Sequence, residues 1–189
     1  MDKLNQHIGK RTKLTQNDKE LLEKVFIPIE VNAKSILIES GKIERYLYFL
    51  NKGIIKGYKN QNGKIIVEHL IEENNFFTSI DSFINESAST DSFETVTDCK
   101  LFKISKTDFD LLRKTDSKWG GFIETVTNEN LQCKMERLND FQTLSAKERY
   151  LKFLKSSSNL AQNVSVENIA SFLGIEPQSL SRIRRQIIL

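Results

Sequence analysis

The spacing of apolar residues changes twice along the chain and divides it into three parts. In the first part, Thr15 precedes Leu21 and Val25 at helical spacing, and Asp18 lies three positions after Thr15. A Thr followed three residues later by an acidic side chain is a helix-start pattern. We therefore expect a short helix that Thr15 caps and that Pro28 ends.

The second part, from residue 30 to residue 104, contains short runs rich in Ile, Val, Phe and Tyr that turn residues separate. Asn62-Gly63 lies between two such runs and is the strongest short-range signal for a hairpin. Many short strands at this spacing predict an antiparallel roll, sandwich or barrel. The expected strands are Ser35–Ile38, Arg45–Leu50, Ile54–Lys59, Lys64–Ile71, Phe93–Val96 and Lys100–Ile104.

The third part begins at Lys106 and has helical spacing throughout. Between Trp119 and Phe141 the apolar positions repeat with a helical period, and no proline interrupts them. This pattern predicts one long helix with an apolar stripe. Such a stripe is either a core face or the contact with a partner helix in a dimer. We favour the dimer, because a helix between two domains has little core to cover.

The last residues predict a pair of short helices joined by a tight turn. An amphipathic helix over Ala146–Phe153 and a polar loop at Ser156–Asn159 come first. Ser165 then caps a helix that Gly174 ends, and Pro177 opens the next helix. Two short helices with a glycine in the turn are typical of a helix-turn-helix.

The second of these helices has a polar face that suits DNA. Leu180 and Ile183 point inward, which leaves Gln, Ser and Arg side chains on the other face. Arg pairs with guanine or phosphate, Gln with adenine, and Ser with either. A plain helical hairpin would have the same apolar spacing, but the polar face favours DNA binding.

Composition and charge agree with a globular nucleic-acid-binding protein. The 189 residues are 39% hydrophobic and 28% charged. The net charge of +3 is uneven, because residues 144–189 carry seven Lys and Arg against three Asp and Glu. This asymmetry suits a domain that meets phosphate, although a solvated basic face gives the same count. No apolar run approaches the ~20 residues that span a bilayer, and Met1–Lys13 lacks the apolar core of a signal peptide, so we expect a cytoplasmic protein.

The stretch from Leu144 to Arg184, above all IASFLGI followed by SLSRIR, strongly resembles the CRP/FNR-type transcription regulators. Residues 38–70, with their glycines and apolar runs, look like the β-roll of the cyclic-nucleotide-binding fold. The resemblance covers nearly the whole chain and implies an α+β fold. It implies an antiparallel β-roll sensor domain over residues 1–116, a dimerisation helix over 117–143 and a helix-turn-helix domain over 144–189.

The resemblance also implies how the protein acts. A homodimer would bind a palindromic operator in double-stranded DNA, with RNA polymerase as an expected partner. Arg182 takes the place of a base-contacting arginine of the family. The family's other two base-contacting positions fall on Pro177 and Gln178, so the operator sequence is not implied. The expected DNA-binding residues are Ser165, Gln178, Ser179, Ser181, Arg182, Arg184 and Arg185.

The residues that bind the phosphate of a cyclic nucleotide in the family are replaced in this chain. Ungapped alignment puts Thr78 at the glycine position, Ser79 at the acidic position, Ser89 at the arginine position and Thr90 at the neighbouring hydroxyl position. No Lys or Arg occurs at positions 65–99. A buried phosphate without a cation would be poorly stabilised. We therefore expect a degenerate effector pocket that does not bind cAMP and that holds an unknown small molecule or nothing.

No metal, cofactor or catalytic site is expected. Cys99 and Cys133 are isolated and too few for a cysteine-only metal cluster, and His69 is interpreted as a sheet residue. No nucleophile elbow, P-loop or HExxH motif occurs. The remaining alternative is a non-enzymatic interaction module that has lost specific DNA binding and whose basic helix meets an acidic protein. Salt-dependent binding to random duplex DNA would separate the two functions.

Overall fold

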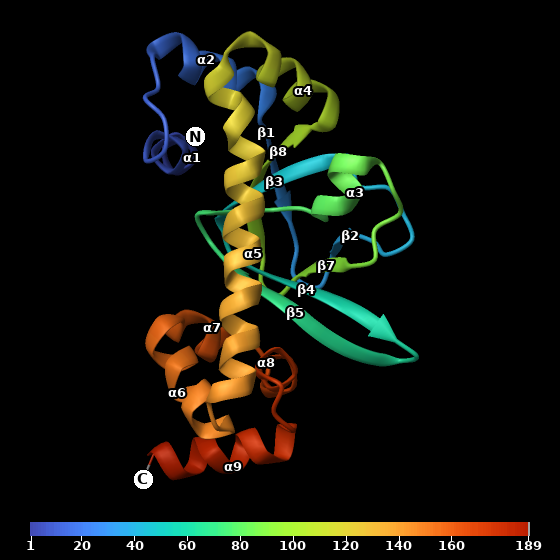
Figure 1. Cartoon of the computed structure of the whole chain (residues 1–189), viewed down its shortest axis with the longest axis vertical. Helices are drawn as coiled ribbons and strands as arrows, with labels where there is room; N and C mark the ends of the chain where they lie inside the picture. Colours follow the sequence, from blue (N-terminus) through green and yellow to red (C-terminus); the bar gives the residue numbers. More distant parts are fainter. Residues whose placement is uncertain (189) are drawn as a thin grey trace.

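The computed structural model describes residues 1–188, except for the side chains at positions 117, 122, 123 and 188. A 24-residue helix, α5 (Gly120–Thr143), runs along the molecule. Figure 1 shows the strands beside the middle of α5, the first helices near one end and the last four helices at the other. Among residues 1–188, no helix combines the length and the apolar character needed to cross a bilayer.

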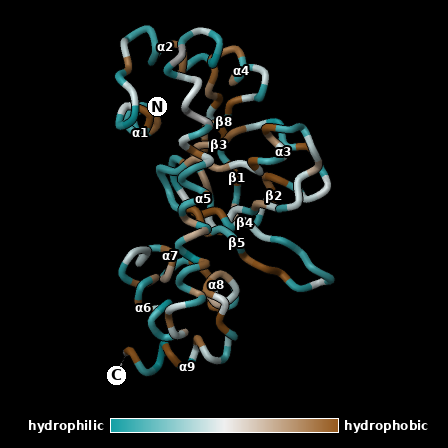
Figure 2. The backbone as a smooth tube through the Cα atoms, viewed as in Figure 1, coloured by the Kyte–Doolittle hydropathy of each residue, from teal (hydrophilic) through white to brown (hydrophobic). Residues whose placement is uncertain are grey.

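The strands form two antiparallel four-stranded sheets. The first has the order β1 (Ile27–Val31), β8 (Cys99–Ser105), β3 (Tyr46–Lys52) and β6 (Asn75–Phe77). The second has the order β2 (Ile36–Ile38), β7 (Ser92–Thr95), β4 (Ile54–Gln61) and β5 (Lys64–Glu72). The β4–β5 hairpin turns at Asn62 and Gly63, which have φ angles of 51° and 88°. In Figure 2 the hydrophobic run Ile65–Val67 follows the hydrophilic tip of this hairpin.

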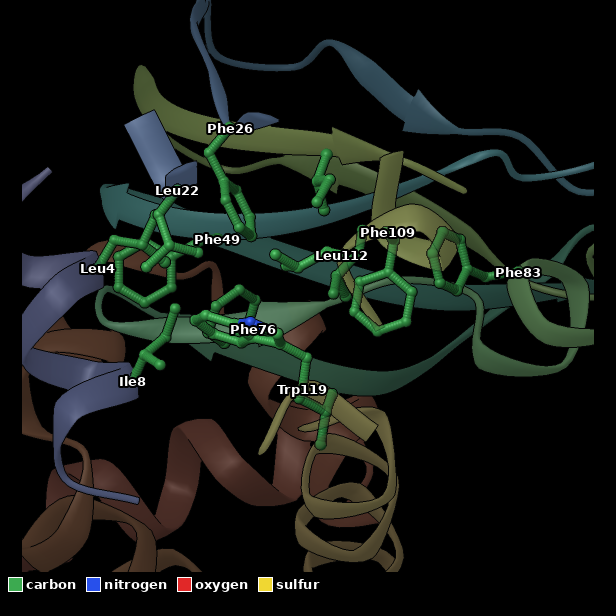
Figure 3. Close-up of a cluster of buried hydrophobic side chains, with 13 residues drawn as sticks. Leu4, Ile8, Leu22, Phe26, Phe49, Phe76, Phe83, Phe109, Leu112 and Trp119 are labelled. Atoms are coloured by element: carbon green, nitrogen blue, oxygen red, sulfur yellow. The ribbon is translucent and has the colours of Figure 1, made fainter. Parts of the chain in front are cut away.

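The main core lies between the first sheet and the helices around it. These helices are α1 (Asp2–Gly9), α2 (Gln16–Val25), α3 (Ile80–Asn85), α4 (Lys106–Thr115) and the short η1 (Ser117–Trp119). Figure 3 shows Leu4, Leu22, Phe49, Phe109 and Trp119 in this cluster. Trp119 immediately precedes α5 and is buried, so the start of the long helix is fixed to the roll.

The C-terminal helices build a second core. They are α6 (Ala146–Ser156), α7 (Ser158–Asn163), α8 (Val166–Leu173) and α9 (Pro177–Ile188). Tyr150, Leu160 and Ile169 are buried in it, and Ile54 of β4 joins the same cluster. This core therefore continues into the roll.

Polar contacts also join the C-terminal helices to β5. The Val67 amide donates to Ser171 Oγ of α8 at 2.9 Å, and that hydroxyl donates to the Ile65 carbonyl at 3.2 Å. Arg137 of α5 donates to the Glu68 carbonyl at 2.6 Å, and its guanidinium lies 5.1 Å from the centre of the Phe172 ring. The first half of β5, the C-terminal third of α5 and α8 thus meet at one place.

The expected α+β fold is confirmed, and so are all six expected strands, with ends that shift by one or two residues. Thr15 caps α2 in a capping box with Asp18, as expected. Two expectations were wrong. Helix α2 ends at Val25, and Pro28 lies in β1, an edge strand in which a missing N–H is tolerated. The polar stretch after Ser156 is also no loop, because Ser158 begins α7.

Candidate DNA-binding helix and sensor cavity

Helices α8 and α9 form the helix-turn-helix. Ser165 Oγ accepts a hydrogen bond from the Asn168 amide at 3.3 Å, which confirms that Ser165 caps α8. Gly174 has a φ of +61°, and the Ile175 amide donates to the Ala170 carbonyl at 2.9 Å. A Cβ at Gly174 would also lie 3.2 Å from the ring of Phe141, so the turn needs glycine for its conformation and for its packing.

The inner faces of the two helices are closely packed. Ile169, Ala170 and Leu180 are completely buried, and Ile183 is 8% exposed. Ala170 is buried in the same core as Leu180 and Ile183 of α9, and a larger side chain there would push the two helices apart. The rigid packing fixes which face of α9 is turned outward.

The outward face of α9 carries polar side chains at helical spacing. One shallow surface depression is lined by Gln178, Ser179, Arg182 and Arg185. Ser181 is half-buried at the flank of this face. Within residues 1–188, Arg182 and Arg185 form no hydrogen bond or ion pair and are exposed. Their donors are therefore free to contact an anion or a base edge.

Arg184 does not belong to this face. Its Nε donates to the Tyr150 hydroxyl and its Nη2 donates to the Ala161 carbonyl, both at 2.8 Å. At 100° per residue, position 184 lies on the flank of α9 next to the buried residues. The expectation that Arg184 is free for DNA is therefore corrected, because its guanidinium joins α9 to α6 and α7.

Sequence analysis also missed Arg149 of α6. Its guanidinium donates to the carbonyl oxygens of Leu144, Leu173 and Gly174 at 2.7, 2.9 and 3.2 Å. It thereby connects the end of α5 with the turn of the helix-turn-helix. A charged residue in an amphipathic helix gives no sequence signal for such a contact.

The four predicted pocket residues lie close together near a cavity between the roll and α5. Thr78, Ser79 and Thr90 line this cavity of about 390 Å³, whereas Ser89 is buried behind its wall. Ser89 Oγ lies 2.8 Å from Ser79 Oγ and 2.7 Å from the Asp91 carbonyl oxygen. The hydroxyl of Ser89, which the resemblance aligns with the phosphate-binding arginine of the family, is therefore used within the protein.

The cavity does contain cationic side chains, which sequence analysis did not expect. Lys59 of β4 and Lys134 of α5 line it, and both lie outside residues 65–99. Lys59 Nζ lies 3.1 Å from Glu68 and 3.6 Å from Asp91. Lys134 Nζ lies 3.8 Å from Glu68. Both cations are thus neutralised by carboxylates and not held ready for a phosphate.

The two cysteines are free thiols, Cys99 buried and Cys133 exposed. Burial raises the pKa of the Cys99 thiol, which keeps it protonated and unreactive.

His69 lines the cavity, and burial, followed by the charge of Lys134, lowers its pKa to about 4. Its imidazole is therefore neutral at physiological pH.

Comparison with known proteins shows which domain and which fold this chain resembles. Residues 28–116 match the family model of the cyclic nucleotide-binding domain. FixK2 from Bradyrhizobium japonicum has a similar structure, with a TM-score of 0.77 at 15% identity over 86% of this chain and 84% of that chain. No curated protein sequence matches the chain.

Two further solved structures resemble most of the chain. The c-di-GMP-responsive regulator CLP from Xanthomonas campestris has a TM-score of 0.72 at 15% identity, over 92% of this chain and 91% of that chain. The catabolite activator protein of Thermus thermophilus has a TM-score of 0.61 at 15% identity, over 96% of this chain and 86% of that chain. Residues 28–116 therefore resemble a cyclic nucleotide-binding domain, and the chain as a whole shares the fold of solved transcription regulators of the CRP/FNR type.

Proposed function

We propose that the protein is a sequence-specific DNA-binding transcription regulator, not an enzyme, and that it binds a palindromic operator as a homodimer. The observation that carries this proposal is the outward face of α9. Gln178, Arg182 and Arg185 recur there at intervals of four and three residues, and the two arginines have no partner within the described residues. A helix that presents free arginines and an amide on a rigid scaffold has the chemistry of a major-groove reader.

The apolar side chains of α5 support the homodimer. Three large apolar side chains of this helix are exposed and recur at intervals of four and three residues. They are Leu131 (56% exposed), Met135 (57%) and Leu138 (50%). Three large apolar residues on one exposed stripe are costly in water, and a second copy of α5 would cover them. A two-fold axis along this stripe would pair two α9 helices and therefore two half-sites.

The sensor domain is proposed to act without cAMP. Ser89 replaces the arginine of the family's phosphate site and is hydrogen-bonded to Ser79. The lysines of the cavity already pair with Glu68 and Asp91. We propose the domain boundaries of residues 1–116, 117–143 and 144–189, RNA polymerase as a partner and a cytoplasmic location as parts of the same function.

In vitro selection of duplex DNA by the purified protein without ligand tests this function. We expect a two-fold symmetric sequence to be enriched. Fluorescence anisotropy on that sequence and on a scrambled duplex then compares Arg182→Ala with Arg185→Ala. Arg182→Ala should reduce the preference for the operator by about 1–3 kcal/mol per half-site. Arg185→Ala should weaken both duplexes alike and lower the salt slope by about one per half-site.

Two outcomes would contradict the proposal. If no sequence is enriched and random duplex binds without salt dependence, α9 serves another partner, as an interaction module would. If Arg182→Ala keeps the full preference for the operator, Gln178, Ser179 or Ser181 reads the bases instead.

A further inference from the structure

One wall of the cavity contains an irregular strand. Tyr58 pairs with Val67 and Gly57 pairs with His69, so Glu68 is an extra residue of β5, a β-bulge. Consecutive side chains of a regular strand point to opposite faces, and a bulge disturbs this alternation and re-aims side chains. As a result, potential ligand atoms of Glu68, His69 and Asp91 all lie within 4.8 Å of one another.

Contacts from two other elements hold this bulge in place. Opposite it, a Cβ at Gly57 would lie 2.8 Å from the Phe93 ring and 3.1 Å from His69 Cβ, so glycine makes room for both rings. Behind it, Arg137 of α5 donates to the Glu68 carbonyl at 2.6 Å. The bulge is thus supported from β4 and from α5.

His69 is placed as a ligand would be. Within residues 1–188, neither of its ring nitrogens forms a hydrogen bond, although its ring stacks on that of Phe93 with centroids 5.8 Å apart. The residue is half-buried and lines the cavity, so an ion in the cavity can reach its ring.

The two carboxylates already hold a cation. The ammonium of Lys59 lies 3.1 Å from Glu68 Oε1 and 3.6 Å from Asp91 Oδ1. The side chains of Lys59 and Lys134 are 33% and 46% exposed, so both can turn to water without crossing the core. The place of the ammonium is therefore open to a competing cation.

We propose that Glu68, His69 and Asp91 form a binding site for a divalent transition-metal ion that replaces the ammonium of Lys59. One imidazole and two carboxylates suit a borderline ion such as Zn²⁺ or Co²⁺, and water would complete its coordination. The site is independent of DNA binding. Its occupation removes the link between Glu68 and Lys134, and so changes how β5 contacts α5.

Titration of the purified full-length chain with Zn²⁺ against a chelating dye tests the site, and Co²⁺ absorption reports the ligand type. We expect one ion per chain. His69→Phe keeps the ring on Phe93 but removes the nitrogens, and Asp91→Asn removes a charge, so each should weaken binding at least about tenfold. Lys59→Met should bind more tightly, because it removes the competing ammonium, and Zn²⁺ should raise its melting temperature more than that of the wild type.

His7→Phe and Cys133→Ser are matched controls, since they remove the other histidine and the exposed thiol. Both should bind the ion as the wild type does. The proposal is wrong if no saturable one-to-one binding occurs. It is also wrong if binding is lost in Cys133→Ser or His7→Phe but kept in His69→Phe. Should His69→Phe fail to fold, unchanged affinity in Asp91→Asn overturns it equally.

Discussion

Arg184→Ala is expected to destabilise the protein while leaving its DNA preference intact. The guanidinium donates two hydrogen bonds of 2.8 Å, to Tyr150 and to Ala161, and it lies 5.8 Å from the centre of the Tyr150 ring. Hydrogen bonds from a charged donor contribute about 1.5–3 kcal/mol each when buried. Arg184 is only half-buried, so in the variant water would hydrogen-bond to part of what the guanidinium leaves. We therefore expect a loss of about 2–3 kcal/mol in the free energy of unfolding.

Urea unfolding of the full chain, followed by circular dichroism, measures the loss as a lower midpoint at an unchanged slope. Arg182→Ala is the matched control, since Arg182 is exposed and has no partner within the described residues, and its effect on stability should stay within about 0.5 kcal/mol. Tyr150→Phe removes one acceptor and should cost about 1 kcal/mol. If Arg184→Ala unfolds like the wild type but loses its affinity for all DNA, Arg184 is a phosphate contact and the structural argument fails.

Three further predictions concern assembly, ligand and pH. Light scattering should give about twice the 21.8 kDa chain mass, and Met135→Glu should halve it while Gln132→Glu, off the stripe, does not. Calorimetry with cAMP and cGMP should show no saturable binding, because Ser89 offers no cation; saturable binding that shifts DNA affinity would refute this. The hydrogen bond from Lys118 lowers the pKa of Asp18 from 3.8 to about 2. Its stabilising charge is therefore complete above pH ~4 and lost as the pH falls toward 2, and Asp18→Asn should remove this part of the acid unfolding curve.

Local signals predicted the roll and the helix-turn-helix well. The Asn62-Gly63 turn, the cap at Ser165 and the glycine at position 174 depend on backbone conformations that a few neighbouring residues decide. The prediction that Pro28 ends α2 was wrong because the effect of a proline depends on its place in the tertiary structure. The same residue that would break a helix is harmless in the edge strand β1.

The chemistry of the cavity could not be predicted in the same way. Lys59 and Lys134 are 75 positions apart and meet only because β4 and α5 both bring a lysine to Glu68, a contact that no local sequence pattern reveals. Arg184 differs, since the helical period alone places it beside the buried flank of α9. The sequence prediction counted arginines without assigning each to a face of α9, and so it included Arg184, whose guanidinium bonds to Tyr150 and Ala161.

The hydroxyl of Ser171 has a consequence for association between molecules. Strand β5 is the outermost strand of its sheet, and such a strand exposes unpaired N–H and C=O groups to which another chain can add. Ser171 occupies the Val67 amide and the Ile65 carbonyl on that edge, so α8 shields it. A fragment that lacks residues 144–189 would uncover the apolar edge at Ile65–Val67, and we expect such a fragment to aggregate through this edge.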